Sequence, residues 1–112
     1  MRQLLIALAL LVAAPALAEE APGRKVEIKV TDAGFEPRQV KVKKGEPVTL
    51  VFTRTTDRTC ITAVDIPDEK VQGLELPLGK PVSVTITPRK TGVEPFHCTA
   101  MGMGNGKLVV QD

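Results

Sequence analysis

A two-residue alternation of apolar and charged side chains recurs along most of this 112-residue chain and constrains its fold more than any other feature. In residues 25–31 (KVEIKVT), for example, Val26, Ile28 and Val30 alternate with polar residues. Because successive side chains of a strand point to opposite faces of a sheet, this pattern predicts a strand that is buried on one face. No later stretch shows a sustained helical period with caps, so we expect an all-β fold.

About seven such strands follow one another at intervals of roughly ten residues, which is typical of a Greek-key β-sandwich or barrel. Besides 25–31, the predicted strands are 38–45, 47–54, 59–67, 81–88, 93–98 and 106–111. Turn-forming pairs and triplets separate them: Ala33-Gly34, Lys44-Gly45, Gly79-Lys80-Pro81, Lys90-Thr91-Gly92 and Asn105-Gly106. Residues 68–78 have room for a single helical turn, which Gly73 and Pro77 would limit.

The first 18 residues have the pattern of a secretory signal peptide. Arg2 precedes an apolar run that ends in Ala16-Leu17-Ala18, a typical cleavage signature. The run is too short for a membrane span, and no cysteine stands at the junction for a lipid anchor. We therefore predict a signal peptide at 1–18, a flexible lead-in at 19–24 and one domain at 25–112, exported most simply to a bacterial periplasm.

Charge and composition argue against two classes of function. The formal net charge is only +2, and no basic stripe is interleaved with aromatic residues, so nucleic-acid binding is not expected. No G-x-S-x-G or H-E-x-x-H motif is present, and His97 is the only histidine that could act as a base. The sequence therefore predicts a protein that is not an enzyme.

Residues 95–106 (PFHCTAMGMGNG) concentrate sulfur close to the C-terminus. They hold Cys98, one of two cysteines, together with Met101 and Met103. The two methionines are two positions apart, so an extended loop would turn both thioethers to the same side. Thiolate and thioether sulfur form a soft ligand set that favours Cu(I), whereas zinc prefers four Cys, His or carboxylate ligands and iron–sulfur clusters need four cysteines.

Several landmarks along the chain resemble a known family. They are "GFEP", the pattern V-x-x-G-x-P-V-x-L-x-F-x-R over 42–54, a cysteine opening the next strand, "TPRKTG", "FHC" and a Met-containing loop before "GKLVV". Together they resemble the bacterial cupredoxin-like domains of the type also found in EfeO-like proteins. The resemblance implies that residues 25–112 form a cupredoxin-like domain.

The resemblance also implies a copper site of an unusual kind. Electron-transfer cupredoxins hold copper with two histidines, a cysteine and a weak axial methionine. Here Cys60 stands where the first histidine is expected, and Met101 stands where the second is expected. The chain is therefore similar to the Cu(I)-binding cupredoxins of bacterial copper resistance, and that similarity implies Cys60, Cys98, Met101 and Met103 as the copper ligands.

Two features of this site have other interpretations. In an oxidising compartment Cys60, placed at the start of a strand, and Cys98 could form a disulfide, which in the chain-entropy model would stabilise the fold by roughly 4 kcal/mol. The disulfide could also be the metal-free form of a copper site. His97 precedes Cys98 on a strand and should face the opposite side, so it is an auxiliary ligand at most.

The function predicted from these features is that of an exported copper(I)-binding metallochaperone or copper buffer. Its partners would be a copper donor or acceptor, such as an exporter or an oxidase-assembly factor, and the protein would be a monomer without a membrane anchor. One alternative is a metal-free, disulfide-bonded structural or interaction module. Another is an electron-transfer cupredoxin with an atypical copper site.

Overall fold

The computed structural model describes residues 24–100 and 105–112. The predicted signal peptide (1–18) and most of the predicted lead-in (19–24) lie outside the described residues, as do Met101 and Met103. No helix within the described part of the chain is long and apolar enough to cross a membrane.

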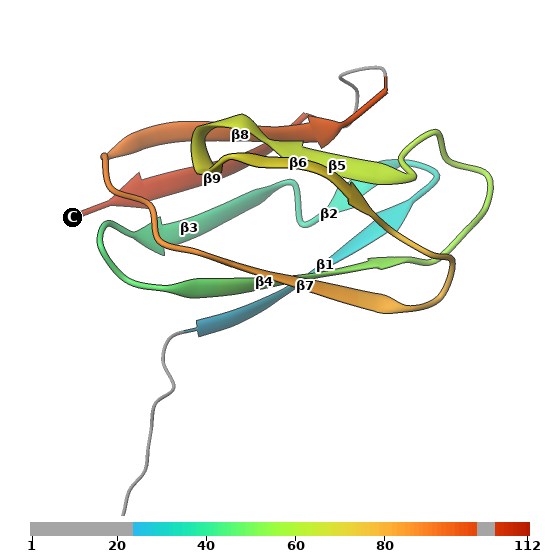
Figure 1. The fold of residues 1–112 in the computed structure, drawn as a ribbon, viewed down its shortest axis with the longest axis horizontal. Coiled ribbons are helices and arrows are strands. Elements are labelled where there is room, and N and C mark those ends of the chain that lie inside the picture. The colour runs from blue at the N-terminus through green and yellow to red at the C-terminus, as the bar shows by residue number, and fades with distance from the viewer. Residues whose placement is uncertain (1–23, 101–104) are drawn as a thin grey trace, which may run out of the picture.

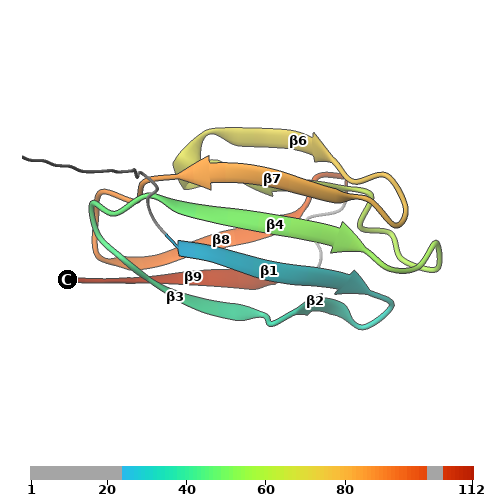
Figure 2. The same ribbon diagram turned by 90° about the horizontal axis from the view of Figure 1, so that it is seen from below.

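The described residues form nine strands arranged as two facing layers (Figure 1). One sheet has the order β2-β1-β4-β7 and the other β3-β9-β8-β5-β6 (Figure 2). The strands are β1 Arg24–Thr31, β2 Gly34–Glu36, β3 Gln39–Lys43, β4 Val48–Arg54, β5 Ala63–Ile66, β6 Val71–Glu75, β7 Pro81–Ile86, β8 Gly92–Cys98 and β9 Gly106–Gln111.

Most neighbouring strands are antiparallel, but two pairs are parallel. β1 pairs with β4, and β3 pairs with β9, the last strand of the chain. Parallel neighbours that are distant in sequence require connections that cross between the sheets, as in a Greek-key sandwich. The all-β sandwich predicted from the alternation is therefore confirmed.

The strand count is higher than the predicted seven because two short strands carry little pattern of their own. β2 has three residues and pairs with β1 as a hairpin. β6 lies within residues 68–78, where the sequence leaves room for a single helical turn. There the chain forms only a 3-10 turn, η2 (Pro67–Glu69), which ends at Lys70 in the left-handed conformation with φ 61°.

One predicted strand begins later than its sequence suggests. The sequence predicts a strand over residues 59–67, with Cys60 at its start, but β5 begins at Ala63. The hydroxyl oxygens of Thr56 and Thr59 instead accept hydrogen bonds from the amides of Arg58 and Ile61. Such local turns replace ladder pairing, and they leave Cys60 in the loop before β5.

Three aromatic rings form the centre of the core between the sheets. Phe96 of β8 meets Phe35 edge-on with ring centroids 4.8 Å apart and meets Phe52 at 5.9 Å. Gly106 faces Phe96 on the neighbouring strand, and a Cβ there would lie 2.0 Å from the ring. Only glycine lets β9 approach this ring, so the start of β9 is set by the core.

Candidate metal centre

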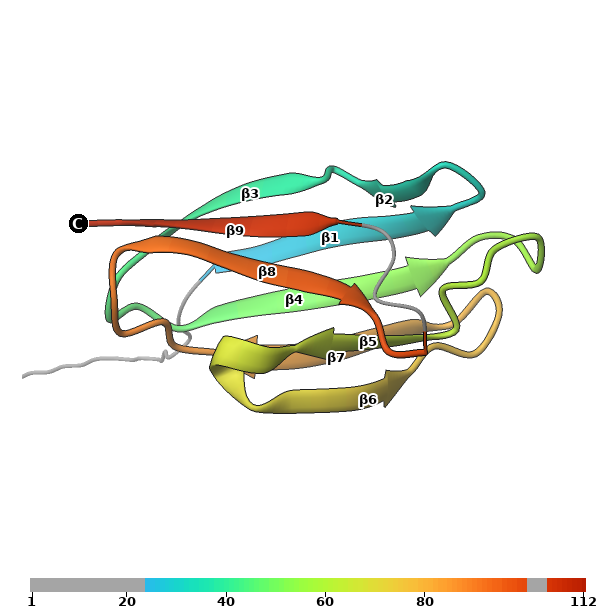
Figure 3. The same ribbon diagram turned by 90° about the horizontal axis from the view of Figure 1, so that it is seen from above.

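Cys98 is the last residue of β8, at the end of the sandwich where β8 leads into the loop before β9 (Figure 3). Phe96 and Cys98 face inward on this strand, with 0% and 1% of their surfaces exposed. Because side chains alternate along a strand, the inward row brings the thiol to the end of the hydrophobic core. The Cys98 thiol is therefore buried.

Cys60 approaches Cys98 through its backbone. Its carbonyl oxygen accepts a hydrogen bond from the Cys98 thiol, with Sγ 3.2 Å from the oxygen, and another from the Thr62 amide at 3.0 Å. Pairing of Val64 on β5 with Cys98 on β8 sets this approach. The Cys60 side chain is exposed, so the contact between the two residues is made by the thiol of Cys98 and the backbone of Cys60.

Both cysteines are free thiols within the described part of the chain. The structure brings together two of the four residues predicted as copper ligands. Met101 and Met103 lie outside the described residues. Residues 24–100 and 105–112 by themselves contain no group of three or more His, Cys, Asp or Glu side chains arranged to hold a metal ion.

The two ends of the methionine loop are fixed to neighbouring strands. Directly after Cys98, the Thr99 amide donates to the carbonyl of Ala63 at 2.9 Å. The Thr99 hydroxyl also donates to a carboxylate oxygen of Asp65 at 2.7 Å. At the other end, the Lys107 amide donates to the carbonyl of Arg38 at 2.7 Å. These anchors fix the residues on either side of the loop, at β5 before it and at the residue that precedes β3 after it.

His97 lies on the face of β8 opposite to Cys98, as the alternation predicted. It is partly buried, and its Nδ1 lies 3.1 Å from the carbonyl oxygen of Cys98. Across the ladder it pairs with Asp65. Hydrogen bonds from the Gly73 amide and the Thr99 hydroxyl lower the pKa of Asp65, and the nearby His97 lowers it further.

Arg54, the last residue of the V-x-x-G-x-P-V-x-L-x-F-x-R pattern, ties the end of β4 to the segment that joins β6 to β7. Its Nε donates to the carbonyl of Leu76 at 2.8 Å, and its own carbonyl accepts from the Gly79 amide at 2.7 Å. The neighbouring Leu78 is 49% exposed. Arg54 donates to a carbonyl 22 residues away, and Asp65 accepts from the Gly73 amide and the Thr99 hydroxyl, so no local pattern identifies these contacts.

In composition, this end of the sandwich is suited to a soft metal. A buried thiol and an exposed cysteine lie together, and the chain continues directly into the loop that holds the two methionines. A single histidine on the opposite strand face excludes a site with two imidazoles from this chain.

Comparison with known proteins identifies the family and the fold. Residues 3–110 match the family model described as cupredoxin-like domain. The NMR structure of a copper binding protein in its apo form has 29% sequence identity and a TM-score of 0.72, over 84% of this chain and 93% of that one. No match is found among curated protein sequences.

Two further solved structures are similar in fold. The metal binding domain of the Cu(I)-exporting P-type ATPase CopA of Streptococcus pneumoniae D39, solved with Cu(I), has a TM-score of 0.75 at 23% identity, over 85% of this chain and 92% of that one. Auracyanin B has a TM-score of 0.60 at 15% identity, over 86% and 94% of the two chains.

Proposed function

Because the chain belongs to the cupredoxin-like domain family, we propose that it binds copper as Cu(I), with Cys60, Cys98, Met101 and Met103 as ligands. The observation that carries the proposal is the approach of the buried Cys98 thiol to the Cys60 carbonyl. The 29% identity to a copper binding protein over most of both chains supports the choice of copper.

The sulfur ligands explain the preference for the reduced ion. Cu(I) is soft and is bound well by thiolate and thioether sulfur, whereas Cu(II) sites rely on imidazole, of which this chain has one. Binding requires loss of the thiol proton, because the thiolate is the ligand. The hydrogen bond from Cys98 to Cys60 would then be replaced by the bond to the metal.

Copper is the cargo in this proposal and not a catalytic cofactor. Thioether ligands are neutral and exchange readily, which suits a metallochaperone or buffer that passes Cu(I) to a partner by ligand replacement. The partner would be a copper exporter or an oxidase-assembly factor that meets the protein after export to the periplasm. We propose no enzymatic activity, and we expect the protein to act as a monomer.

The test is a competition titration of the reduced protein with Cu(I) and a chromophoric chelator. Loss of a thiolate ligand in Cys98→Ser should weaken Cu(I) binding by at least about 100-fold, and Met101→Leu/Met103→Leu should weaken it less. Ser83→Ala on β7, an exposed position in the other sheet, is the matched control and should bind like the wild type. Equal competition by Cys98→Ser and wild type would contradict the proposal.

A second candidate, a metal-free module closed by a Cys60–Cys98 disulfide, is favoured by the adjacency of the two cysteines at one end of the fold. Counting free thiols in protein taken directly from the producing cells separates the two functions. The first candidate predicts two thiols protected by copper, and the second predicts none. Intense visible absorption on addition of Cu(II) would instead indicate an electron-transfer centre.

A further inference from the structure

Away from the sulfur site, β8 buries a carboxylate at its opposite end. Glu94 faces inward in the same row as Phe96 and Cys98, and only 8% of its surface is exposed. Four residues along a strand correspond to roughly 13 Å, so Glu94 lies well away from Cys98. It is the one charged residue that is buried within the described part of the chain.

The carboxylate of Glu94 is incompletely satisfied. Its Oε1 atom is buried and has no hydrogen-bond partner among the described residues. A buried polar atom without a partner typically costs about 1–3 kcal/mol, and more when the group is charged. The site therefore favours the arrival of a hydrogen-bond donor.

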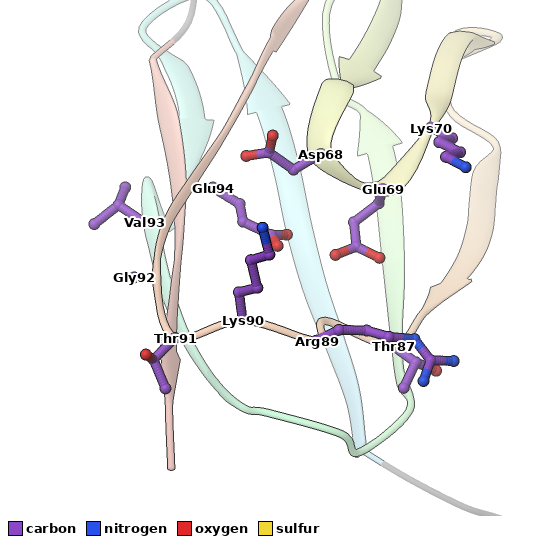
Figure 4. Close-up of a pocket in the computed structure, with 10 residues that line it drawn as sticks. All are labelled: Asp68, Glu69, Lys70, Thr87, Arg89, Lys90, Thr91, Gly92, Val93 and Glu94. Carbon is purple, nitrogen blue, oxygen red and sulfur yellow. The ribbon is translucent and has the colours of Figure 1, made fainter.

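Glu94 lines a cavity of about 520 Å³ between η2 and the segment that joins β7 to β8. Asp68 and Glu69 of η2 place two further carboxylates around the same space (Figure 4). We call the cavity with these three side chains, Asp68, Glu69 and Glu94, the carboxylate pocket. Its acidic groups come from two elements that are distant in sequence, so the fold assembles it.

Three basic residues, Lys70, Arg89 and Lys90, also line this cavity, but all three are exposed to solvent. In Figure 4 Lys70 and Arg89 extend away from the carboxylates, and Lys90 rises beside Glu94. The one ion pair within the described residues joins Lys44 and Asp112, so none of these three cations forms an ion pair with the pocket. Within the described part of the chain, the Glu94 carboxylate has no ion-pair partner.

Burial raises the pKa of Glu94 to about 7, and a hydrogen bond to the Glu69 carboxyl and the negative charges of Glu69 and Asp68 add to the effect. Near neutral pH, a bound proton therefore neutralises part of the Glu94 population, as a counter-ion would. A bound cation would compete with this proton for the same carboxylates.

We propose that the carboxylate pocket binds an organic cation through a primary ammonium or guanidinium group, which donates N–H hydrogen bonds to Glu94 and the neighbouring carboxylates. The inference is independent of copper binding. The argument rests on the buried, unpaired Oε1 of Glu94, on the acidic groups of η2 and on the size of the cavity.

An organic cation fits this space better than a metal ion. Oxygen ligands must converge to within about 2.0–2.6 Å of a bound Mg²⁺ or Ca²⁺, and no such group of acidic side chains exists within the described residues. N–H donors reach their acceptors at about 2.7–3.2 Å from a larger head group and leave room for an alkyl chain. A volume of about 520 Å³ suits the larger ligand.

The test is a titration of copper-free protein with putrescine, followed by the backbone amide NMR signals of residues 68, 69 and 94. Putrescine should shift these signals, and its affinity should rise between pH 6 and pH 8, because binding releases the proton held by Glu94 to the buffer. Glu94→Gln, which keeps the shape but not the charge, should weaken binding by at least about tenfold. Glu27→Gln on the exposed face of β1 is the matched control and should bind like the wild type.

Two further probes define the chemistry. Tetramethylammonium carries the charge without N–H donors and should not bind, whereas the Nα-acetylated amides of lysine and arginine should bind if the natural source is a protein side chain. Stronger binding of putrescine than of these amides would indicate a free polyamine.

Several results would overturn the proposal. They are unchanged affinity in Glu94→Gln, affinity that does not vary between pH 6 and pH 8, binding of tetramethylammonium as tight as that of putrescine, or a response to Ca²⁺ or Mg²⁺ alone. Absence of any shift at tens of millimolar putrescine would also reject it.

Discussion

The inward row of β8 buries a polar group at each end, but the two groups differ in how they are satisfied. The thiol of Cys98 is 1% exposed and donates to the carbonyl of Cys60, so its hydrogen bond is complete. Glu94 as a whole residue is 8% exposed, and its carboxylate keeps one oxygen unpaired beside two other acidic residues. Both ends flank the same aromatic core at Phe96.

The difference shows that the energetic cost of burying a group depends on how polar the group is. A thiol is weakly polar, so a single backbone acceptor stabilises it, and it stays available as a soft ligand once its proton is lost. A carboxylate is strongly hydrated in water, so the same degree of burial destabilises its charged form and favours uptake of a proton or a cation. The two ends of one strand are thereby suited to different ions.

The largest effect should come from removing the aromatic ring that separates the two ends. Phe96→Ala should lower the free energy of unfolding by about 3–5 kcal/mol, because it leaves a cavity beside Phe35 and Phe52. Gly106→Ala should also destabilise the wild type, since its Cβ would meet the Phe96 ring. Urea denaturation of both variants measures the two changes.

The double variant sharpens this prediction. In a Phe96→Ala background the added methyl of Gly106→Ala no longer meets a ring and should be tolerated. Equal destabilisation by Gly106→Ala in both backgrounds would show that the close approach of β9 to Phe96 is not the cause.

The next largest change in the free energy of unfolding should come from Glu94, and its size should depend on pH. The pKa of Glu94 is about 7 when folded and 4.5 in the reference state, so the unfolded chain binds fewer protons at Glu94 between these values. Stability should therefore fall as pH rises from about 4.5 to 7, by about 3 kcal/mol from this group, and level off above 7. Glu94→Gln should lack this contribution, so its stability relative to the wild type should increase with pH.

Urea denaturation of both proteins at several pH values between 4 and 8 measures this difference, in which groups that do not interact with Glu94 cancel. A wild-type minus variant difference that is constant over the range would show that Glu94 ionises normally. In that case the contrast between the two ends of β8 would disappear.

A smaller loss of stability is expected from replacing Asp65, whose carboxylate binds Thr99, the residue directly after Cys98. Asp65→Asn weakens the hydrogen bonds from the Gly73 amide and the Thr99 hydroxyl and should lower stability at pH 7 by roughly 1 kcal/mol, given the partial exposure of the site. The pKa of Asp65 is lowered in the fold, so this stabilisation is present above its reference value of 3.8 and is lost as pH falls below it.

Acid denaturation tests the Asp65 prediction, with Asp57→Asn, an exposed acidic residue of the Cys60 loop, as the control. The stability deficit of Asp65→Asn should shrink below about pH 4, and Asp57→Asn should show no deficit at any pH. A deficit of Asp65→Asn that persists unchanged in acid would mean that shape, rather than charge, accounts for the loss.

The smallest change in stability should accompany Cys98→Ser. The serine hydroxyl can donate to the Cys60 carbonyl in place of the thiol, so unfolding free energy should change by no more than about 1 kcal/mol. Thermal denaturation of the reduced, metal-free proteins measures this change. A loss of several kcal/mol would show that the thiol is a structural group, and a weakened Cu(I) affinity of the variant could then be explained by misfolding.

Much of the fold follows from local pattern. The alternation of Val26, Ile28 and Val30 places a strand correctly, and turn residues separate most of the others. The alternation predicts strand at Cys60, but this residue lies in a loop, because the threonines there accept hydrogen bonds from nearby amides. The alternation that turns Cys98 inward also turns Glu94 inward, so the sequence pattern alone is enough to predict a buried carboxylate on this strand.

The amino-acid sequence by itself determined a two-layer β fold, the inward direction of Cys98 and the soft character of the sulfur-rich region. These properties depend on side-chain chemistry and on a two-residue period, both of which are local. Only the tertiary structure decided that the Cys98 thiol meets the backbone of Cys60, 38 residues away, and that Glu94 meets the acidic turn of η2. Such contacts depend on the order of strands within the sheets, and no local pattern encodes that order.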